Sequence, residues 1–312
     1  MKISLPYAII LMFCFGFRTT DPFNHCYQQG RFLILYSTAR DHALPLAKQK
    51  DHNKNGTPDF IEDIALQLQV ADRLYEEVFK LRHPLKSPRY TRERVEFIKV
   101  SMKNGLEFDG IAFDGVSTYE YQKGDSSRRV KTLVIHINNA IKSNNHTPAH
   151  ELMHLYQNGY TLFKTRWYTE GMARWVESAL AKGTGKVGEL PMNEIQREKQ
   201  VFALTYKASL FWNALAKRSD TKGGEIQLPP SLLAMTYTNG KPIIEDHYFY
   251  GAQFLKTVLE ELDQEDNVVS RTEGLKSYFW EESRQKSADN NEHIWRAIEQ
   301  ACRKMQVDYS LR

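Results

Sequence analysis

Cysteine is scarce in this chain: three occur in 312 residues, which leaves room for one disulfide bond at most. Long apolar runs are lacking as well, because the run at residues 5–17 is too short to span a bilayer, and a polytopic membrane protein is excluded. Charge is balanced, with 42 Lys and Arg against 38 Asp and Glu, and no basic block or stripe is present. Nucleic acid is therefore not an expected partner.

Apolar and aromatic residues are plentiful enough for a substantial core. Hydrophobic residues make up 41% of the chain, aromatic residues 12% and charged residues 26%, which is typical of a water-soluble globular protein and excludes disorder over most of the chain. The length predicts about one to two domains.

Residues 1–20 have the pattern of a secretory signal peptide. Lys2 precedes the apolar run, whose length fits a signal sequence. We therefore predict an exported protein, secreted or periplasmic, with cleavage between residues 19 and 25 and no membrane span after removal of the signal. No small-x-small cleavage site follows the run, so an uncleaved signal anchor is one alternative and an apolar first helix of the folded domain is another.

Two cysteines remain after removal of the signal, Cys26 near the new N-terminus and Cys302 near the C-terminus. In an exported chain they could form a disulfide that joins the two ends, and this is our hypothesis. Two free thiols are the alternative. Neither cysteine is expected to be catalytic, because nothing nearby in the sequence would lower its pKa.

Hydrophobic periodicity predicts an α+β fold with a mixed front and a helical back. Alternating or continuous apolar runs predict strands at residues 32–36, 95–101, 111–121 and 132–138. Steps of three and four residues predict helices at residues 60–78, 147–158, 168–181, 193–217, 245–262 and 291–306. We therefore expect an N-terminal lobe at residues 27–160, with a small sheet and a backing helix, and a helical C-terminal lobe at residues 161–312.

A His-Glu-x-x-His motif occupies residues 150–154 at a predicted helix start. His150 and His154 are one helical turn apart, so both imidazoles face the same point, as zinc ligands require. Glu151 lies one residue round the helix, where it can reach a water molecule on the metal but not easily the metal itself. This spacing predicts that Glu151 is the general base.

Glu170 is the predicted third ligand. Fifteen residues separate it from His154, enough chain for a second helix to return beside the first and complete a site that leaves one position for water. Glu177, two turns beyond Glu170, could orient a ligand imidazole or pair with Arg174. The alternative is a chance motif followed by an exposed helix with surface glutamates.

The segments HELMH and WYTEGMARWVE resemble the gluzincin zinc metallopeptidases, the broad group that contains thermolysin and aminopeptidase N. The resemblance implies a zincin-like fold, a Zn2+ cofactor held by His150, His154 and Glu170, and a peptide or protein substrate hydrolysed with Glu151 as general base. The spacer before Glu170 is shorter than in the best-known members, and Thr169 replaces a common Asn. The subfamily and any exopeptidase features are therefore not transferred.

An oxyanion-stabilising group is expected in addition. His247, Tyr248 and Tyr250, at the start of the predicted helix 245–262, are candidates, and aromatic packing is the alternative for each. His136, in a predicted strand, and His146, just before the metal helix, are interpreted as structural histidines.

An acidic loop upstream has the spacing of an EF-hand-type Ca2+ loop. Its matching positions are 1, 3, 5, 6, 7, 9 and 12, filled by Asp51, Asn53, Asn55, Gly56, Thr57, Asp59 and Glu62. The alternative is an Asn/Gly turn that leads into the next helix. The combination of this loop with the two zinc segments also resembles a group of predicted secreted bacterial metalloproteases.

The sequence thus predicts a zinc metallopeptidase that binds its substrate between the two lobes. A non-catalytic zincin that serves as a secreted binding scaffold is the alternative from another class. A zinc hydrolase that acts on a non-peptide amide is a further alternative, because the same water activation serves any scissile carbonyl.

Overall fold

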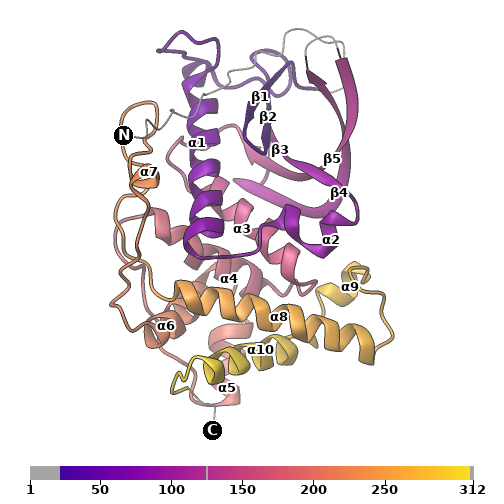
Figure 1. The fold of residues 1–312 in the computed structure, drawn as a ribbon, viewed down its shortest axis with the longest axis vertical. Coiled ribbons are helices and arrows are strands. Elements are labelled where there is room, and N and C mark those ends of the chain that lie inside the picture. The colour runs from indigo at the N-terminus through magenta and orange to yellow at the C-terminus, as the bar shows by residue number, and fades with distance from the viewer. Residues whose placement is uncertain (1–21, 124–125, 310–312) are drawn as a thin grey trace, which may run out of the picture.

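The computed structural model describes residues 22–123 and 126–309 (Figure 1). The predicted signal peptide at residues 1–20 lies outside these residues, so export stays a prediction. Within the described ranges, no helix is both long enough and apolar enough to cross a membrane.

A five-stranded mixed sheet forms most of the N-terminal part, with the strand order β1-β2-β3-β5-β4. Its strands are β1 (His25–Gln29), β2 (Phe32–Tyr36), β3 (Val95–Lys103), β4 (Gly110–Lys123) and β5 (Ser126–Asn138). β2, β3 and β5 run parallel, while β1 and β4 are antiparallel edge strands. The four predicted strands are confirmed. β1 was not predicted, because its HCYQQ sequence is mostly polar and half-buried.

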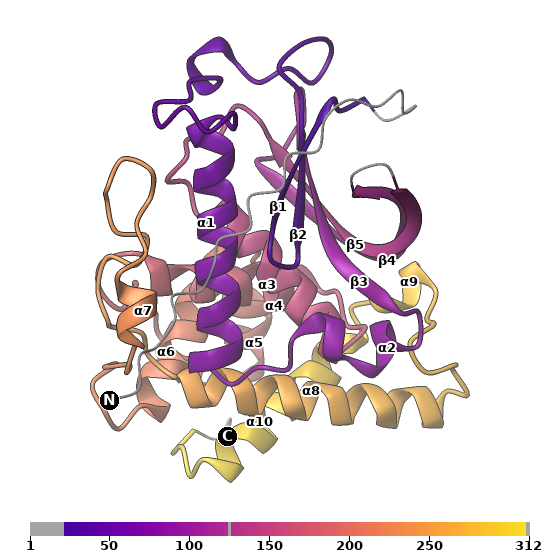
Figure 2. The ribbon, with the colours of Figure 1, turned by 45° about the horizontal axis from the view of Figure 1, so that its top comes forward.

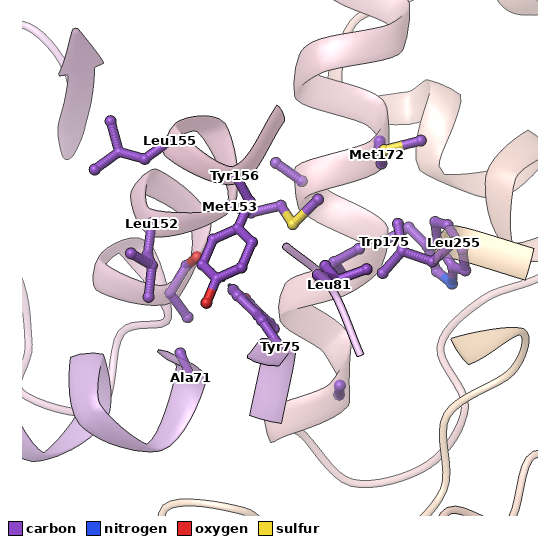
Figure 3. Packing of buried hydrophobic residues seen from close by; sticks show 14 of the residues in the cluster. Ala71, Tyr75, Leu81, Leu152, Met153, Leu155, Tyr156, Met172, Trp175 and Leu255 are labelled. Carbon is purple, nitrogen blue, oxygen red and sulfur yellow. Dashed lines mark hydrogen bonds between the residues drawn. The ribbon is translucent and has the colours of Figure 1, made fainter. Parts of the chain in front are cut away.

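Two helices cover one face of the sheet, as Figure 2 shows: α1 (Asp59–Arg73) and α3 (Thr147–Tyr160). Alternate residues of the central strands, such as Val100 and Ile135, are fully buried on this face. Figure 3 shows the core residues of α3 in close view, with Tyr156 beside Tyr75. Met153 of α3 points towards α4, the helix that carries Met172. α3 therefore packs against the sheet on one side and against the helical C-terminal part on the other.

The C-terminal part is mainly helical, which confirms the predicted α+β class. Its helices are α4 (Arg166–Glu177), α5 (Glu194–Arg197), α6 (Ser209–Ser219), α7 (Pro230–Leu233), α8 (Ala252–Thr272), α9 (Glu282–Gln285) and α10 (Asn290–Lys304); the short α2 (Pro88–Thr91) belongs to the N-terminal part. α4 packs on α3 and α6, and α8 packs on α10. One hydrophobic cluster contains residues of both predicted lobes, and the boundary after residue 160 stays a prediction.

Two predicted helices differ in the structure. The helix predicted at 193–217 is interrupted at residues 203–208, where Thr205 adopts φ −122° and ψ −111°. No Gly or Pro marks this break. Tertiary packing accounts for it, because Phe202 packs at a tilt against Trp167 and edge-on against Trp295. The helix predicted at 245–262 begins only at Ala252, after a left-handed Gly251.

The predicted disulfide is wrong, because Cys26 and Cys302 are not joined to each other. Cys26 lies on β1 and Cys302 on α10, and in Figures 1 and 2 these elements are at opposite ends of the molecule. Burial raises the pKa of the Cys302 thiol to about 12, so it is a core residue without thiolate reactivity.

Candidate metal centre

Helices α3 and α4 bring the three predicted ligands together. The ligand atoms of His150, His154 and Glu170 all lie within 4.8 Å of one another. Oε2 of Glu170 is 3.3 Å from Nε2 of His150 and 3.6 Å from Nε2 of His154. The structure thus contains a His-His-Glu group that could hold a metal ion, and in the described residues it is the one such group of His, Cys, Asp or Glu.

The orientation of both imidazoles fits a metal site. Nδ1 of His150 lies 2.7 Å from the Glu177 carboxylate, and Nδ1 of His154 lies 2.8 Å from Oε1 of Gln157. Each acceptor holds a proton on Nδ1, so Nε2 is the nitrogen of each ring that is available to a metal ion. Two imidazole nitrogens and one carboxylate are a donor set that suits zinc and leaves a position open for water.

Burial and ion pairing set the protonation of the metal-free group. Burial disfavours the charged form of His150, but hydrogen bonds with Glu170 and Glu177 outweigh it and raise the pKa of His150 to about 10. Burial also opposes ionisation of Glu170, but the hydrogen bonds with His150 and His154 outweigh it and lower the Glu170 pKa. The carboxylate is therefore ionised, as a metal ligand must be.

Glu151 lies beneath the edge strand β4, 5% exposed. Burial raises its pKa, and the two ligand histidines and a hydrogen bond from the backbone N–H of Ala112 reduce the rise. The start of β4 passes so close that a Cβ on Gly110 would lie 2.7 Å from Cγ of Glu151. The predicted general base is thus held between the metal ligands and the backbone of an edge strand.

A cavity of about 890 Å3 opens beside these groups. Its walls are the start of β4, the beginning of α4 and the interrupted segment at residues 202–206. The residues from the metal centre that line it are Glu151, His154 and Glu170. The cavity therefore gives a ligand access both to the metal group and to the edge strand.

Tyr206 is a site residue that the sequence analysis did not find. Its hydroxyl is hydrogen-bonded to Glu170, and burial together with this carboxylate raises its pKa to about 12, so the phenol stays protonated. Gly171 allows this approach, because a Cβ there would lie 2.7 Å from Cβ of Ala208. The sequence carried no signal for Tyr206, since residues 193–217 follow the pattern of one continuous helix.

The three residues predicted to stabilise the oxyanion lie elsewhere. His247, Tyr248 and Tyr250 are in the loop that precedes α8, and none of them is among the described residues that line the cavity. Tyr248 stacks on His247, and Tyr250 lies under the ammonium group of Lys217. The cause is the left-handed Gly251, because α8 begins only after it, about two turns later than the periodicity predicts.

The two other histidines have structural surroundings. His136 lies edge-on to Phe113, and burial, Lys103, Lys99 and His42 lower its pKa to about 4. His146 precedes α3, and burial lowers its pKa. Neither is a member of the metal group.

The acidic loop at residues 51–62 folds around its own side chains. The Asp51 carboxylate accepts hydrogen bonds from the N–H groups of Asn55 and Gly56, and the side-chain amides of Asn53 and Asn55 donate to Glu62. Asp59 pairs with His52, and the Thr57 side chain is hydrogen-bonded to Tyr36, which leaves the backbone carbonyl of Thr57, its predicted Ca2+ ligand, untested. These contacts are also those of an Asn/Gly turn, so Ca2+ stays a prediction.

Comparison with protein-family models, with curated proteins and with solved structures finds no match for this chain. The class that the structure itself defines is a mixed α+β protein with a buried His-His-Glu group able to hold a metal ion. A buried carboxylate, a protonated phenol and an edge strand adjoin that group at one cavity.

Proposed function

We propose that this chain is a zinc-dependent metallopeptidase of the gluzincin type with a zincin-like fold. The observation that carries the proposal is the convergence of His150, His154 and Glu170 beside a cavity whose wall contains Glu151, His154 and Glu170. A metal site that served stability alone would be closed by a fourth protein ligand. Here the cluster borders an open cavity and has a carboxylate beside it.

The residues have distinct chemical roles in this proposal. A bound zinc ion would supply a Lewis acid that activates water and polarises the scissile carbonyl. Glu151 would take a proton from the attacking water and pass it to the leaving amine; its raised pKa suits both transfers near neutral pH. The protonated hydroxyl of Tyr206 would donate a hydrogen bond to the oxyanion.

The edge strand β4 supports a peptide as the substrate. Its first residues, 110–114, line the cavity, and one side of the strand has no partner strand among residues 22–123 and 126–309. An extended peptide can add to such an edge through main-chain hydrogen bonds. A peptide bound in this way would pass directly over Glu151, because Gly110 and Ala112 contact that side chain.

The test compares the zinc-loaded full chain with its Glu151→Gln variant on a diverse peptide mixture, with new termini identified by mass spectrometry. Cleavage by the wild type alone, abolished by a chelator, would support the proposal and reveal the specificity. Equal silence of both proteins towards peptides would favour a non-peptide amide or a binding scaffold. Equal cleavage by both would contradict the role of Glu151.

Export and Ca2+ binding are also proposals. The inward-facing oxygens of Asp51 and Glu62 support a Ca2+ ion in the loop. We expect Asp51→Ala to lower the melting temperature by more with Ca2+ present than with a chelator. An identical shift of the melting temperature under both conditions would contradict Ca2+ binding and favour the Asn/Gly turn.

A further inference from the structure

One cation at the cavity, Arg166, has no counter-charge among the residues that the structure describes. Lys164, Arg166 and Lys286 all line the cavity. Lys164 lies 2.7 Å from the Asp114 carboxylate, and Lys286 pairs with Glu282. Arg166 is exposed, and in the part of the chain that the structure describes no carboxylate lies within ion-pair distance of it.

Arg166 is close to the reacting groups. It is the first residue of α4, four residues or about one turn before Glu170, so the two residues share a face of the helix and both line the cavity. Four residues of α-helix rise by roughly 6 Å. An extended peptide covers that length with roughly two residues. A group bound by Arg166 would therefore belong to a residue very near the scissile bond.

The N-terminus of α4 adds to the positive potential at this point. Its first turn contains no acidic residue, and the preceding Thr165 makes no side-chain hydrogen bond that caps the helix. The Thr165 hydroxyl is buried without a hydrogen-bond partner among the described residues, although Thr165 itself lines the cavity. Uncapped N–H groups and the helix dipole both favour an anion there.

We propose that Arg166 and the N-terminus of α4 bind a carboxylate of the peptide substrate and select acidic substrates. The carboxylate is either the C-terminal one or the side chain of Asp or Glu, which share the chemistry that a guanidinium recognises in bidentate form. The inference deepens the proposed peptidase function and rests on it for the substrate class. It does not rest on turnover, because binding can be measured separately.

The test measures binding without cleavage. The probes are fluorescently labelled alanine hexapeptides with Glu or Gln at each position in turn, each made with a free and an amidated C-terminus. Their dissociation constants are measured by anisotropy on the zinc-loaded Glu151→Gln protein, alone and combined with Arg166→Gln, Arg166→Lys or Lys286→Gln. Lys286→Gln is the matched control, because it removes a cation of the same cavity that already has a partner.

We expect Arg166→Gln to weaken binding of the preferred acidic probe about tenfold to a hundredfold, as loss of a charge-assisted contact does, and to leave the amidated Gln probes unchanged. Arg166→Lys should restore part of the affinity, and Lys286→Gln should change it by less than about twofold. Sensitivity to amidation identifies the C-terminal carboxylate, and sensitivity to Glu against Gln identifies a side chain.

Equal affinity for acidic and neutral probes, or an equal loss in Arg166→Gln and Lys286→Gln, would overturn the proposal, as would the absence of binding to every probe. Acidic-probe binding that depends on Arg166 in a protein that cleaves no peptide would instead retain the carboxylate site and refute the peptidase. The two failures are thus distinguishable.

Discussion

Glu177 lies 2.7 Å from Nδ1 of His150, two turns along α4 from Glu170. Its other oxygen pairs with Arg174, so both contacts considered from the sequence are present. One helix therefore supplies a ligand of its own and also fixes the orientation of a ligand on the neighbouring helix.

Removal of Glu177 should weaken zinc binding. Glu177→Ala frees the Nδ1 side of His150, and groups that orient a ligand in this way typically contribute about tenfold to a hundredfold in affinity. Competition with a chromophoric chelator measures the effect. Arg174→Ala is the control, since it removes the other partner of Glu177 and should retain most of the affinity. An unchanged affinity in Glu177→Ala would show that the ring is held in other ways.

Variants at Glu151 and Glu170 should distinguish a loss of catalysis from a loss of metal binding. Glu151→Gln should retain a full zinc content and lower kcat by about a hundredfold to ten-thousandfold, because the proton acceptor is lost. Glu170→Ala should lose zinc itself. Metal analysis after dialysis and peptide-hydrolysis kinetics distinguish the two, and a full zinc content in Glu170→Ala would refute the third ligand.

Tyr206→Phe removes only the hydroxyl that faces Glu170. We expect kcat to fall by about a hundredfold to a thousandfold with little change in KM or zinc content, because the lost hydrogen bond forms to the oxyanion. Stability should be almost unchanged, since Tyr206 is 47% exposed. Tyr248→Phe is the matched control: Tyr248 is 41% exposed but does not line the cavity. If Tyr248→Phe had the larger effect, the sequence-based candidate would be correct.

Gly110→Ala should displace Glu151. The added Cβ would lie 2.6 Å from Cγ2 of Thr147 and 2.7 Å from Cγ of Glu151, so β4 and α3 must move apart. We expect a lower melting temperature and a loss of activity. Gly115→Ala on the same strand is the control, because its Cβ would meet nothing within 4 Å. Similar melting temperatures and activities in the two variants would contradict the close contact.

His136 should contribute to acid sensitivity. Burial and the nearby Lys103, Lys99 and His42 lower its pKa in the folded protein from 6.5 to about 4. The unfolded chain therefore binds the proton more readily, so the contribution of His136 to the free energy of unfolding is intact above pH 6.5 and is lost as the pH falls towards 4. Urea unfolding at several pH values should show a smaller loss in His136→Gln. An NMR titration with a ring pKa near 6.5 would contradict this.

Local periodicity made part of the centre predictable. His150, Glu151 and His154 belong to one helix, and 3.6 residues per turn place the two imidazoles on one side whatever the helix packs against. The four predicted strands follow equally from alternating or continuous apolar runs, and α1 follows from apolar residues at steps of three and four.

The features that the sequence did not predict depend on contacts between segments far apart in the chain. The break that presents Tyr206 has no Gly or Pro, and it forms because Phe202 packs on Trp167 and Trp295. The disulfide between Cys26 and Cys302 was predicted wrongly for the same reason. The local sequence around each cysteine does not indicate that β1 and α10 lie at opposite ends of the molecule.

The sequence by itself determined which residues could bind a metal on α3 and which of them could act as a base, because those properties depend on residue type and helical spacing. Only the tertiary structure decided that Glu170 completes the group, that Glu177 orients His150 and that β4 covers Glu151. It also decided that Arg166 lines the cavity with no counter-charge in the described part of the chain. The physical reason is that these relationships are set by how helices and strands pack, and packing is a property of the whole core rather than of any one segment.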